Sequence, residues 1–177
     1  MIMMDKILPE RKSPRLKEFD YTTPAYYFVT ICTKSRRRLF GNISNSKIEL
    51  NEKGITVRNC LNQLQEHFTN IELDCFAIMP DHFHGIIILN GPVGLSSPKT
   101  GIKTNKFSLS QIIAYFKYQS TKGINNISGN SGCKVWQRSF YDRIIRNDRE
   151  LYNIRRYVEL NPLKWEIEKN RPENLEI

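Results

Sequence analysis

The strongest constraint on the fold is a pair of apolar runs that only two residues separate. Residues 73–79 and 82–89 are rich in β-branched and aromatic side chains, as buried strands are. Only Pro80 and Asp81 lie between them, which leaves room for a tight turn and nothing longer. The sequence therefore predicts an antiparallel hairpin with a tight turn.

The second strand of this hairpin begins with two histidines. His82 and His84 flank Phe83, and because side chains alternate along a strand, both imidazoles are expected on one face. Two imidazoles so placed can share a metal ion, although paired histidines on a half-exposed strand can also be ordinary surface residues. Asp81 can orient one histidine or serve only as a turn residue.

Apolar spacing predicts the other elements. The resulting order is strand, helix, two strands, helix, strand and one more helix. This order favours an α+β fold. We expect a ferredoxin-like split βαβ antiparallel sheet, with helices on one face plus a C-terminal helix. The segments are a strand at 26–33, a turn at Gly41-Asn42 before an alternating run at 47–50, helices at 55–68, 108–122 and 147–161, and extended stretches at 134–137 and 141–145.

The length of 177 residues suits one domain with its own core. We therefore expect a single domain over residues 1–177. A basic N-terminal arm covers about 1–24, flexible loops cover about 91–106 and 123–133, and an acidic tail covers about 163–177.

The charge of the chain favours a polyanionic partner. Lys and Arg total 27 against 18 Asp and Glu, a formal net charge of +9. Such an excess attracts nucleic acid through its phosphates, although a solvated cationic surface has the same composition. The basic residues that we predict to contact DNA phosphates are Arg36, Arg37, Arg38, Lys117, Lys122, Arg138, Arg143, Arg146 and Arg156.

Other classes of protein fit the sequence poorly. No run approaches the roughly 18 apolar residues of a membrane span, and the N-terminus lacks the apolar core of a signal peptide. The four cysteines form no CxxC pair, which favours reduced thiols. We expect a cytoplasmic protein that does not bind membranes.

The last predicted helix completes a candidate catalytic set. Tyr157 and Asn161 are four residues apart and so share one helical face. The Asn161 amide oxygen, with the two histidines, would suit Mg²⁺ or Mn²⁺, although imidazoles also bind zinc. Beside such a metal the Tyr157 hydroxyl can attack a phosphodiester and form a covalent protein–DNA intermediate. Tyr141 is the best competing nucleophile, but it has no amide partner at helical spacing.

These motifs resemble a known family. Residues 76–89 resemble the HUH motif, His-hydrophobic-His, of the single-tyrosine transposases. Residues 135–146 and 156–162 are similar to its REP-associated branch, as are the opening segments 15–21 and 27–33, so that the resemblance covers about residues 11–165. Many members have Gln at the position of Asn161, but the Asn-Pro ending is typical of the REP-associated branch.

The resemblance implies a ferredoxin-like fold and a definite activity. It assigns a divalent cation, Mg²⁺ or Mn²⁺, to His82, His84 and Asn161, and it makes Tyr157 the nucleophile. The expected function is cleavage and rejoining of single-stranded DNA at hairpin sites through a 5′-phosphotyrosine intermediate. Alternatives are a non-catalytic nucleic-acid-binding module and a domesticated DNA-binding regulator of the same fold. A homodimer is possible, and the DNA sequence read is open.

Overall fold

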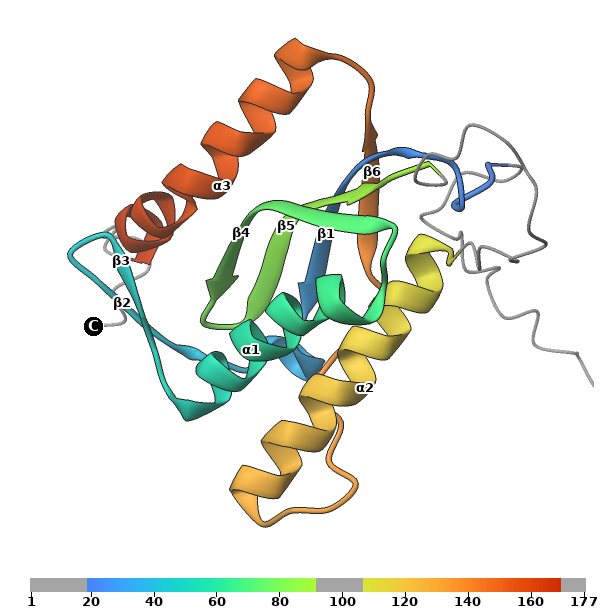
Figure 1. Ribbon diagram of the computed structural model, residues 1–177. Coiled ribbons are helices and arrows are strands. Elements are labelled where there is room, and N and C mark those ends of the chain that lie inside the picture. Colours follow the sequence, from blue (N-terminus) through green and yellow to red (C-terminus); the bar gives the residue numbers. More distant parts are fainter. Residues whose placement is uncertain (1–18, 92–106, 170–177) are drawn as a thin grey trace, which may run out of the picture.

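The computed structural model describes residues 19–91 and 107–169. Most of the predicted N-terminal arm, nearly all of the first predicted loop and the end of the predicted tail lie outside these residues. The main sheet contains β1 (Ala25–Cys32), β4 (Ile71–Met79), β5 (His82–Leu89) and β6 (Tyr141–Ile145). Their order is β4-β5-β1-β6, and every neighbouring pair is antiparallel (Figure 1). The predicted hairpin is confirmed, since β4 and β5 are joined by Pro80 and Asp81 alone.

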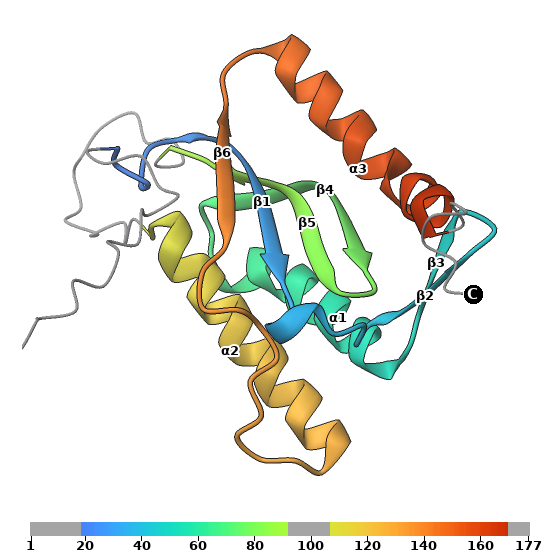
Figure 2. The same ribbon diagram turned by 180° about the vertical axis from the view of Figure 1, so that it is seen from behind.

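The helices lie on both sides of this sheet. Helices α1 (Glu52–His67) and α2 (Leu109–Ser128) pack together on one face, whereas α3 (Asp148–Lys169) lies against the other (Figures 1 and 2). The arrangement is the α+β fold that the sequence predicts, with the final helix apart from the other two. No helix within residues 19–91 and 107–169 is long and apolar enough to span a membrane.

The main hydrophobic core fills the space between the sheet and helices α1 and α2. Alternation along β1 sends Tyr27, Val29 and Ile31 into this core, and all three are fully buried. Helix α1 contributes Leu61 and α2 contributes Phe116, both at 0% exposure. Burial of this many large apolar side chains supplies most of the driving force for folding.

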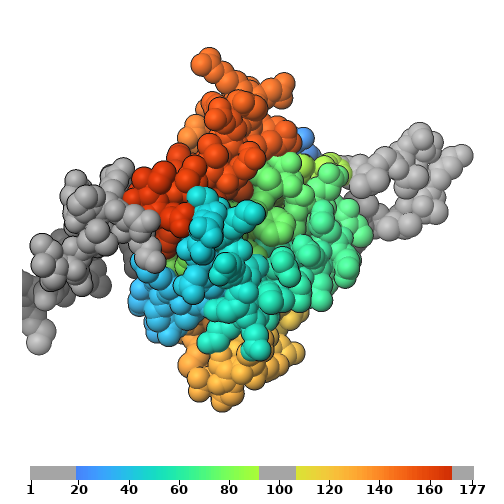
Figure 3. Space-filling view, turned by 90° about the vertical axis from the view of Figure 1, so that its left-hand side faces the viewer, coloured from blue at the N-terminus to red at the C-terminus, as the bar shows by residue number. Residues whose placement is uncertain are grey.

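A second small sheet is an element that the sequence prediction missed. Strands β2 (Gly41–Ser44) and β3 (Lys47–Leu50) form a hairpin, so the predicted turn at Gly41-Asn42 is wrong. The turn lies at Asn45 and Ser46, which both have positive φ angles of 52° and 58°, as a type I′ turn requires. The prediction failed because neither residue of this turn is glycine. In the space-filling view of Figure 3, the β2–β3 hairpin (cyan) lies between α3 and α1.

Helix α2 is longer than its apolar pattern predicts. Residues 123–128, assigned to a flexible loop, are helical, and the helix ends at Gly129, which has the left-handed φ of 64° typical of a C-terminal cap. A Cβ on Gly123 would lie 2.7 Å from Cγ2 of Thr56 on α1. Gly123 therefore permits close approach of the two helices and does not end α2. Beyond the helix, Trp136 pairs with Thr33 through an isolated β-bridge.

Helix α3 continues past the predicted stop. Pro162 lies inside the helix, which runs to Lys169, so part of the predicted tail is helical. Proline removes one backbone donor and usually bends a helix. The residues after it make contacts that stabilise the continuation: Trp165 lies against His82, and Glu166 accepts hydrogen bonds from Ser46.

Candidate functional site

The two histidines lie on the face of the sheet that α3 covers. His82 pairs with Cys32 of β1 and His84 pairs with Thr30, so both imidazoles project to the same side, as expected. The side chains are buried, with 7% exposure for His82 and 1% for His84. Their ring centroids are 5.1 Å apart.

His84 is a buried polar side chain without hydrogen-bond partners. Both of its ring nitrogens are inaccessible, and neither has a partner among the described residues. Burial, and then the neighbouring His82, lower the pKa of His84 to about 3. The imidazole is therefore neutral at physiological pH, which is the form that binds metal ions.

His82 is oriented by a short polar chain. Its Nδ1 lies 2.6 Å from Oδ1 of Asp81, and the second carboxylate oxygen lies 3.3 Å from Nε of Arg36. In the tautomer of His82 that donates from Nδ1 to this carboxylate, the Nε2 lone pair is left for a ligand. Of the two roles considered for Asp81, orienting a histidine and forming a turn, this contact supports the first.

Helix α3 places three side chains over the histidines at intervals of one turn. The Tyr157 ring lies 5.4 Å from that of His84, and the Trp165 ring lies 5.8 Å from that of His82. Asn161 is halfway between these aromatic residues along the helix and is buried, at 7% exposure. Four-residue spacing puts all three on one helical face. Asn161 is therefore on the side of α3 that carries the two rings in contact with the histidines.

Three attachments hold α3 in this position. Arg155 makes two hydrogen bonds to Asp74 of β4, at 2.8 and 3.1 Å. Nearer its C-terminal end, Glu166 accepts from the backbone N–H and the hydroxyl of Ser46, at 2.7 and 3.0 Å. Between them, Val158 packs in a small apolar cluster with residues of β4.

These attachments, and two further neighbours of the site, were not predicted from the sequence. Lys164 places its ammonium group 5.4 Å from the centre of the Tyr157 ring, and Trp165 borders His82. Helical spacing from Tyr157 would have indicated both residues, had the helix been extended through Pro162.

Tyr141 lies on the same face but farther from the histidines. On β6 it pairs with Thr30 of β1, which in turn pairs with His84 of β5. Two inter-strand spacings, together about 10 Å, therefore separate the Tyr141 and His84 backbones. Tyr141 is 63% exposed, because α3 packs over β4 and β5. Among the described tyrosines, Tyr157 is the one that contacts His84.

Some predicted phosphate contacts already interact within the protein. Arg36 pairs with Asp81, Arg143 pairs with Glu150 at 2.6 Å, and Arg38 lies 5.8 Å from the Trp165 ring. Lys117 donates to backbone carbonyls of residues 137–139, so its ammonium group supports that segment.

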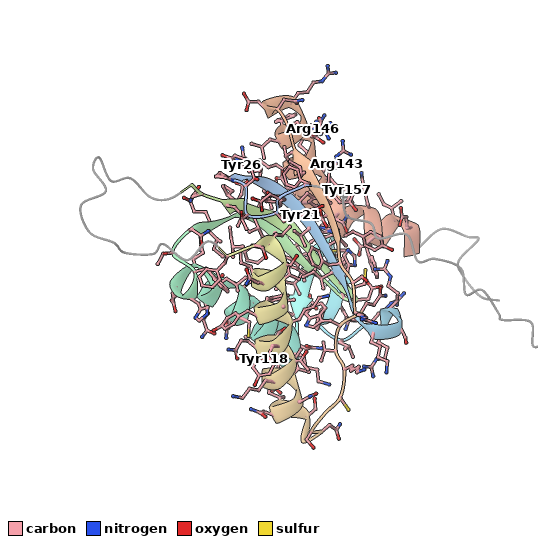
Figure 4. All side chains as sticks on the ribbon, turned by 90° about the vertical axis from the view of Figure 1, so that its right-hand side faces the viewer. Tyr21, Tyr26, Tyr118, Arg143, Arg146 and Tyr157 are labelled. Atoms are coloured by element: carbon pink, nitrogen blue, oxygen red, sulfur yellow. The ribbon has the colours of Figure 1, made fainter. Side chains whose placement is uncertain are left out.

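The remaining predicted contacts are exposed, but they do not form one cluster. Figure 4 shows Arg143 and Arg146 at the same end of the molecule as Tyr157, with Tyr118 of α2 toward the other end. The exposed members of the predicted set, besides Arg36, Arg38 and Arg143, are Arg37, Lys122, Arg138, Arg146 and Arg156.

The residues around the histidines fit a divalent cation. The described part of the chain has no group of three or more His, Cys, Asp or Glu side chains that could hold a metal ion. At the histidine pair, only two ligands would be of these residue types. A metal ion there would be held by His82 and His84, and the Asn161 amide and oxygens from water or substrate would supply the further ligands. The unpartnered nitrogens of His84 are the observation that favours such a ligand.

Comparison with known proteins gives consistent matches. The family profile described as "Transposase IS200 like" matches residues 21–161. An uncharacterized protein of Haemophilus influenzae is 34% identical over 164 residues, covering 88% of this chain and 90% of the relative. A second protein of that organism, named "Putative REP-associated tyrosine transposase", is 26% identical over 153 residues, covering 82% and 74%.

A solved structure has the same fold. It is a REP-associated tyrosine transposase bound to a REP hairpin, and it superposes with a TM-score of 0.57 at 19% sequence identity. The match covers 85% of this chain and 72% of that one. The antiparallel sheet and its helices are thus shared with a protein of very different sequence.

Proposed function

The chain belongs to the IS200-like transposase family, in its REP-associated tyrosine transposase branch, and we propose that it cleaves and rejoins single-stranded DNA through Tyr157. The observation that carries this proposal is the position of the Tyr157 ring, 5.4 Å from a buried histidine whose nitrogens have no partner. A histidine so placed costs stability, which is expected where the side chain serves a ligand.

The proposed reaction exchanges one ester bond for another. The phenolic oxygen of Tyr157 attacks the phosphorus of a phosphodiester, and the bond to the 3′-oxygen breaks. The phenolic proton passes to solvent, and the departing oxygen takes up a proton to become a 3′-hydroxyl. The phosphate of the 5′ end stays on Tyr157. Attack by a 3′-hydroxyl on this phosphotyrosine reverses the reaction and joins two ends without external energy.

The surrounding residues support this chemistry. A divalent cation held by His82, His84 and Asn161 would polarise the phosphoryl oxygen and neutralise charge in the transition state. Asp81 orients His82 through its contact with Nδ1, and Lys164 adds positive charge beside the Tyr157 ring. Tyr157 is 41% exposed, so its ring is accessible to a DNA strand that lies over β1 and β6, the part of the sheet beside α3.

Hairpin DNA is the proposed substrate. The protein of similar fold was solved with a REP hairpin, and the exposed cations near the site suit a phosphate backbone. The test is incubation with labelled hairpin DNA from the flanks of its own gene, plus Mg²⁺ or Mn²⁺, followed by a denaturing gel. We expect a metal-dependent adduct that Tyr157→Phe abolishes and that Tyr141→Phe retains. An adduct that survives Tyr157→Phe would contradict the assignment of the nucleophile.

A further inference from the structure

The two buried histidines have different aromatic neighbours on α3. The Tyr157 ring lies 5.4 Å from that of His84, whereas the Trp165 ring lies 5.8 Å from that of His82. Trp165 follows Tyr157 at a distance of about two helical turns. Tyr157 is the proposed nucleophile, but an indole has no hydroxyl with which to attack phosphorus. The contact of Trp165 with a proposed metal ligand therefore requires a different role.

Trp165 restricts the imidazole of His82. Asp81 contacts one ring atom of this histidine, Nδ1, at 2.6 Å. A contact at one atom leaves the ring free to tilt about it. The half-buried indole, whose plane is inclined by 41° to that of the imidazole, opposes such a tilt. The two contacts together define the orientation of the ring.

The indole is itself held from the other side of the site by a cation. The guanidinium carbon of Arg38 lies 5.8 Å from the centre of the Trp165 ring, within the range of a cation–π interaction. Arg38 is exposed, and it belongs to the segment that follows β1. Trp165 thus contacts this segment as well as the strand that carries His82.

The segment after β1 is bonded to the turn that precedes His82. It includes η1 (Lys34–Arg36). The backbone N–H groups of residues 39 and 40 donate to the Pro80 carbonyl at 2.8 and 3.1 Å, and that of Thr33 donates to the Asp81 carbonyl at 2.9 Å. Three backbone hydrogen bonds therefore hold the segment and the turn together as one unit, against which the indole packs.

Contacts of α3 place the indole on this unit. Glu166, the next residue, accepts from the backbone N–H and the hydroxyl of Ser46, at 2.7 and 3.0 Å. Lys164, the preceding residue, places its ammonium group 5.4 Å from the centre of the Tyr157 ring. Figures 1 and 2 show the C-terminal end of α3 beside the β2–β3 hairpin. The position of Trp165 is therefore set by its own helix as well as by the unit that it contacts.

Metal-binding histidines use two kinds of support from their surroundings. One is a polar contact that orients the ring, which Asp81 supplies to His82. The other is an apolar shell that limits access of water, and the indole of Trp165 lies where such a shell is needed. Trp165 also packs against the apolar cluster of Ala77, Met79 and Val158. An aliphatic side chain would serve packing alone, whereas contacts with an imidazole and a guanidinium favour an aromatic ring.

We propose that Trp165 is a positioning residue of the metal site: its indole holds the His82 imidazole in the orientation that binds a divalent cation and keeps bulk water from that imidazole. The inference rests on the proposed function for the presence of the cation. It also gives Arg38, a predicted phosphate contact, a role in supporting Trp165.

The test measures binding of Mn²⁺ to the protein without DNA, through the electron paramagnetic resonance signal of the free ion. Trp165→Leu keeps an apolar side chain but removes the ring, and Trp165→Phe keeps a ring. Ile154→Ala is the matched control, because Ile154 also packs from α3 against the apolar cluster but lies beyond Tyr157 along the helix. Thermal melting measures how far each change destabilises the fold.

We expect Trp165→Leu to weaken Mn²⁺ binding by about tenfold or more, as loss of a residue that orients a metal ligand does. Trp165→Phe should keep most of the affinity. Ile154→Ala should bind Mn²⁺ as the wild type does, although it lowers the melting temperature. Equal affinities in Trp165→Leu and Ile154→Ala, an equal loss in Trp165→Phe and Trp165→Leu, or a wild type that does not bind Mn²⁺ would overturn the proposal.

Tryptophan fluorescence is a second measurement that does not need the leucine variant. Co²⁺ also binds imidazole, and a bound Co²⁺ ion quenches a tryptophan beside it. The chain has two tryptophans, and Trp136 lies in the main core on the other face of the sheet. We expect Co²⁺ to quench the wild type but neither Trp165→Phe nor His82→Ala. Equal quenching in the wild type and His82→Ala, or no quenching in the wild type, would overturn the proposal. Because DNA is absent, a protein that binds metal as expected but forms no adduct would contradict only the proposed function.

Discussion

The two faces of the sheet have different compositions and different tasks. The face under α1 and α2 buries an apolar cluster in which many side chains, such as Leu61 and Phe116, have no exposure at all. Among the described residues, the apolar cluster on the side of α3 has three buried members, Ala77, Met79 and Val158, and the two histidines are buried beside it. Buried polar side chains without partners reduce stability. The comparison indicates that the first face stabilises the fold and that the second gives up some stability to hold the site.

The largest expected effect is on the second face. His84→Leu removes a proposed metal ligand, so cleavage of hairpin DNA should fall by more than about 100-fold. The same change replaces unpartnered polar atoms by an apolar side chain, so the free energy of unfolding should be unchanged or higher. Cleavage is followed on gels and unfolding by urea titration.

The control for this prediction is His67→Leu. His67 lies at the end of α1 on the other face of the sheet, where its ring stacks on Tyr115 at 4.0 Å. We expect this variant to cleave DNA at the wild-type rate. A His84→Leu protein that cleaves normally, or that unfolds far more easily than wild type, would contradict the division between the faces.

The next effect concerns the apolar face. Phe116→Ala would leave a cavity in the main core and should lower the free energy of unfolding by about 3 to 5 kcal/mol. Phe28→Ala on the opposite face should cost less, because Phe28 is only half-buried. Urea titrations of the two variants check the difference. Equal losses would show that the two faces contribute alike to stability.

Acid should destabilise the metal-free protein through His84. The pKa of this side chain is lowered from 6.5 to about 3 in the folded state, so below pH 6.5 the unfolded chain binds a proton that the folded chain refuses. Stability is therefore lost as the pH falls from 6.5 toward 3, by at most about 1.4 kcal/mol per pH unit from this group. Urea titrations in EDTA should show a weaker pH dependence for His84→Leu. An identical dependence would contradict the burial of a neutral His84.

The smallest effect is expected at an attachment of α3. Arg155→Ala removes a half-exposed ion pair with Asp74 and should cost about 0.2 to 1 kcal/mol in the free energy of unfolding. Because this pair helps to position Tyr157, the cleavage rate should fall by more than that small loss of stability explains. Arg149→Ala, which changes an exposed arginine in the first turn of α3, is the matched control. Equal rates in the two variants would show that the ion pair does not position the nucleophile.

Local pattern was enough to predict the strands of the main sheet and the face that carries the histidines. The hairpin of β4 and β5 was evident because Pro80 and Asp81 allow only a tight turn between apolar runs. The predicted set of His82, His84, Tyr157 and Asn161 followed from strand and helix periods. The spacing along one strand or one helix decides which residues share a face, so each of the two pairs, His82 with His84 and Tyr157 with Asn161, can be predicted without knowledge of tertiary contacts.

Contacts between distant residues could not be read in this way. Gly123 indicates a loop in the sequence, but in the fold it lets α2 cross α1 beside Thr56. Pro162 indicates a helix end, but Trp165 and Glu166 beyond it make contacts that keep α3 helical. The pairing of Arg155 with Asp74 spans 81 residues and leaves no trace in local pattern. Tertiary contacts overrode intrinsic propensity in both helices.

The central claim is that Tyr157 becomes covalently attached to DNA. The most direct measurement is mass spectrometry of the adduct after nuclease trimming and proteolysis, which identifies the residue that carries the nucleotide. We predict a nucleotide joined through its 5′-phosphate to the peptide that contains Tyr157. A nucleotide on the peptide that contains Tyr141, or attachment through a 3′-phosphate, would contradict the account.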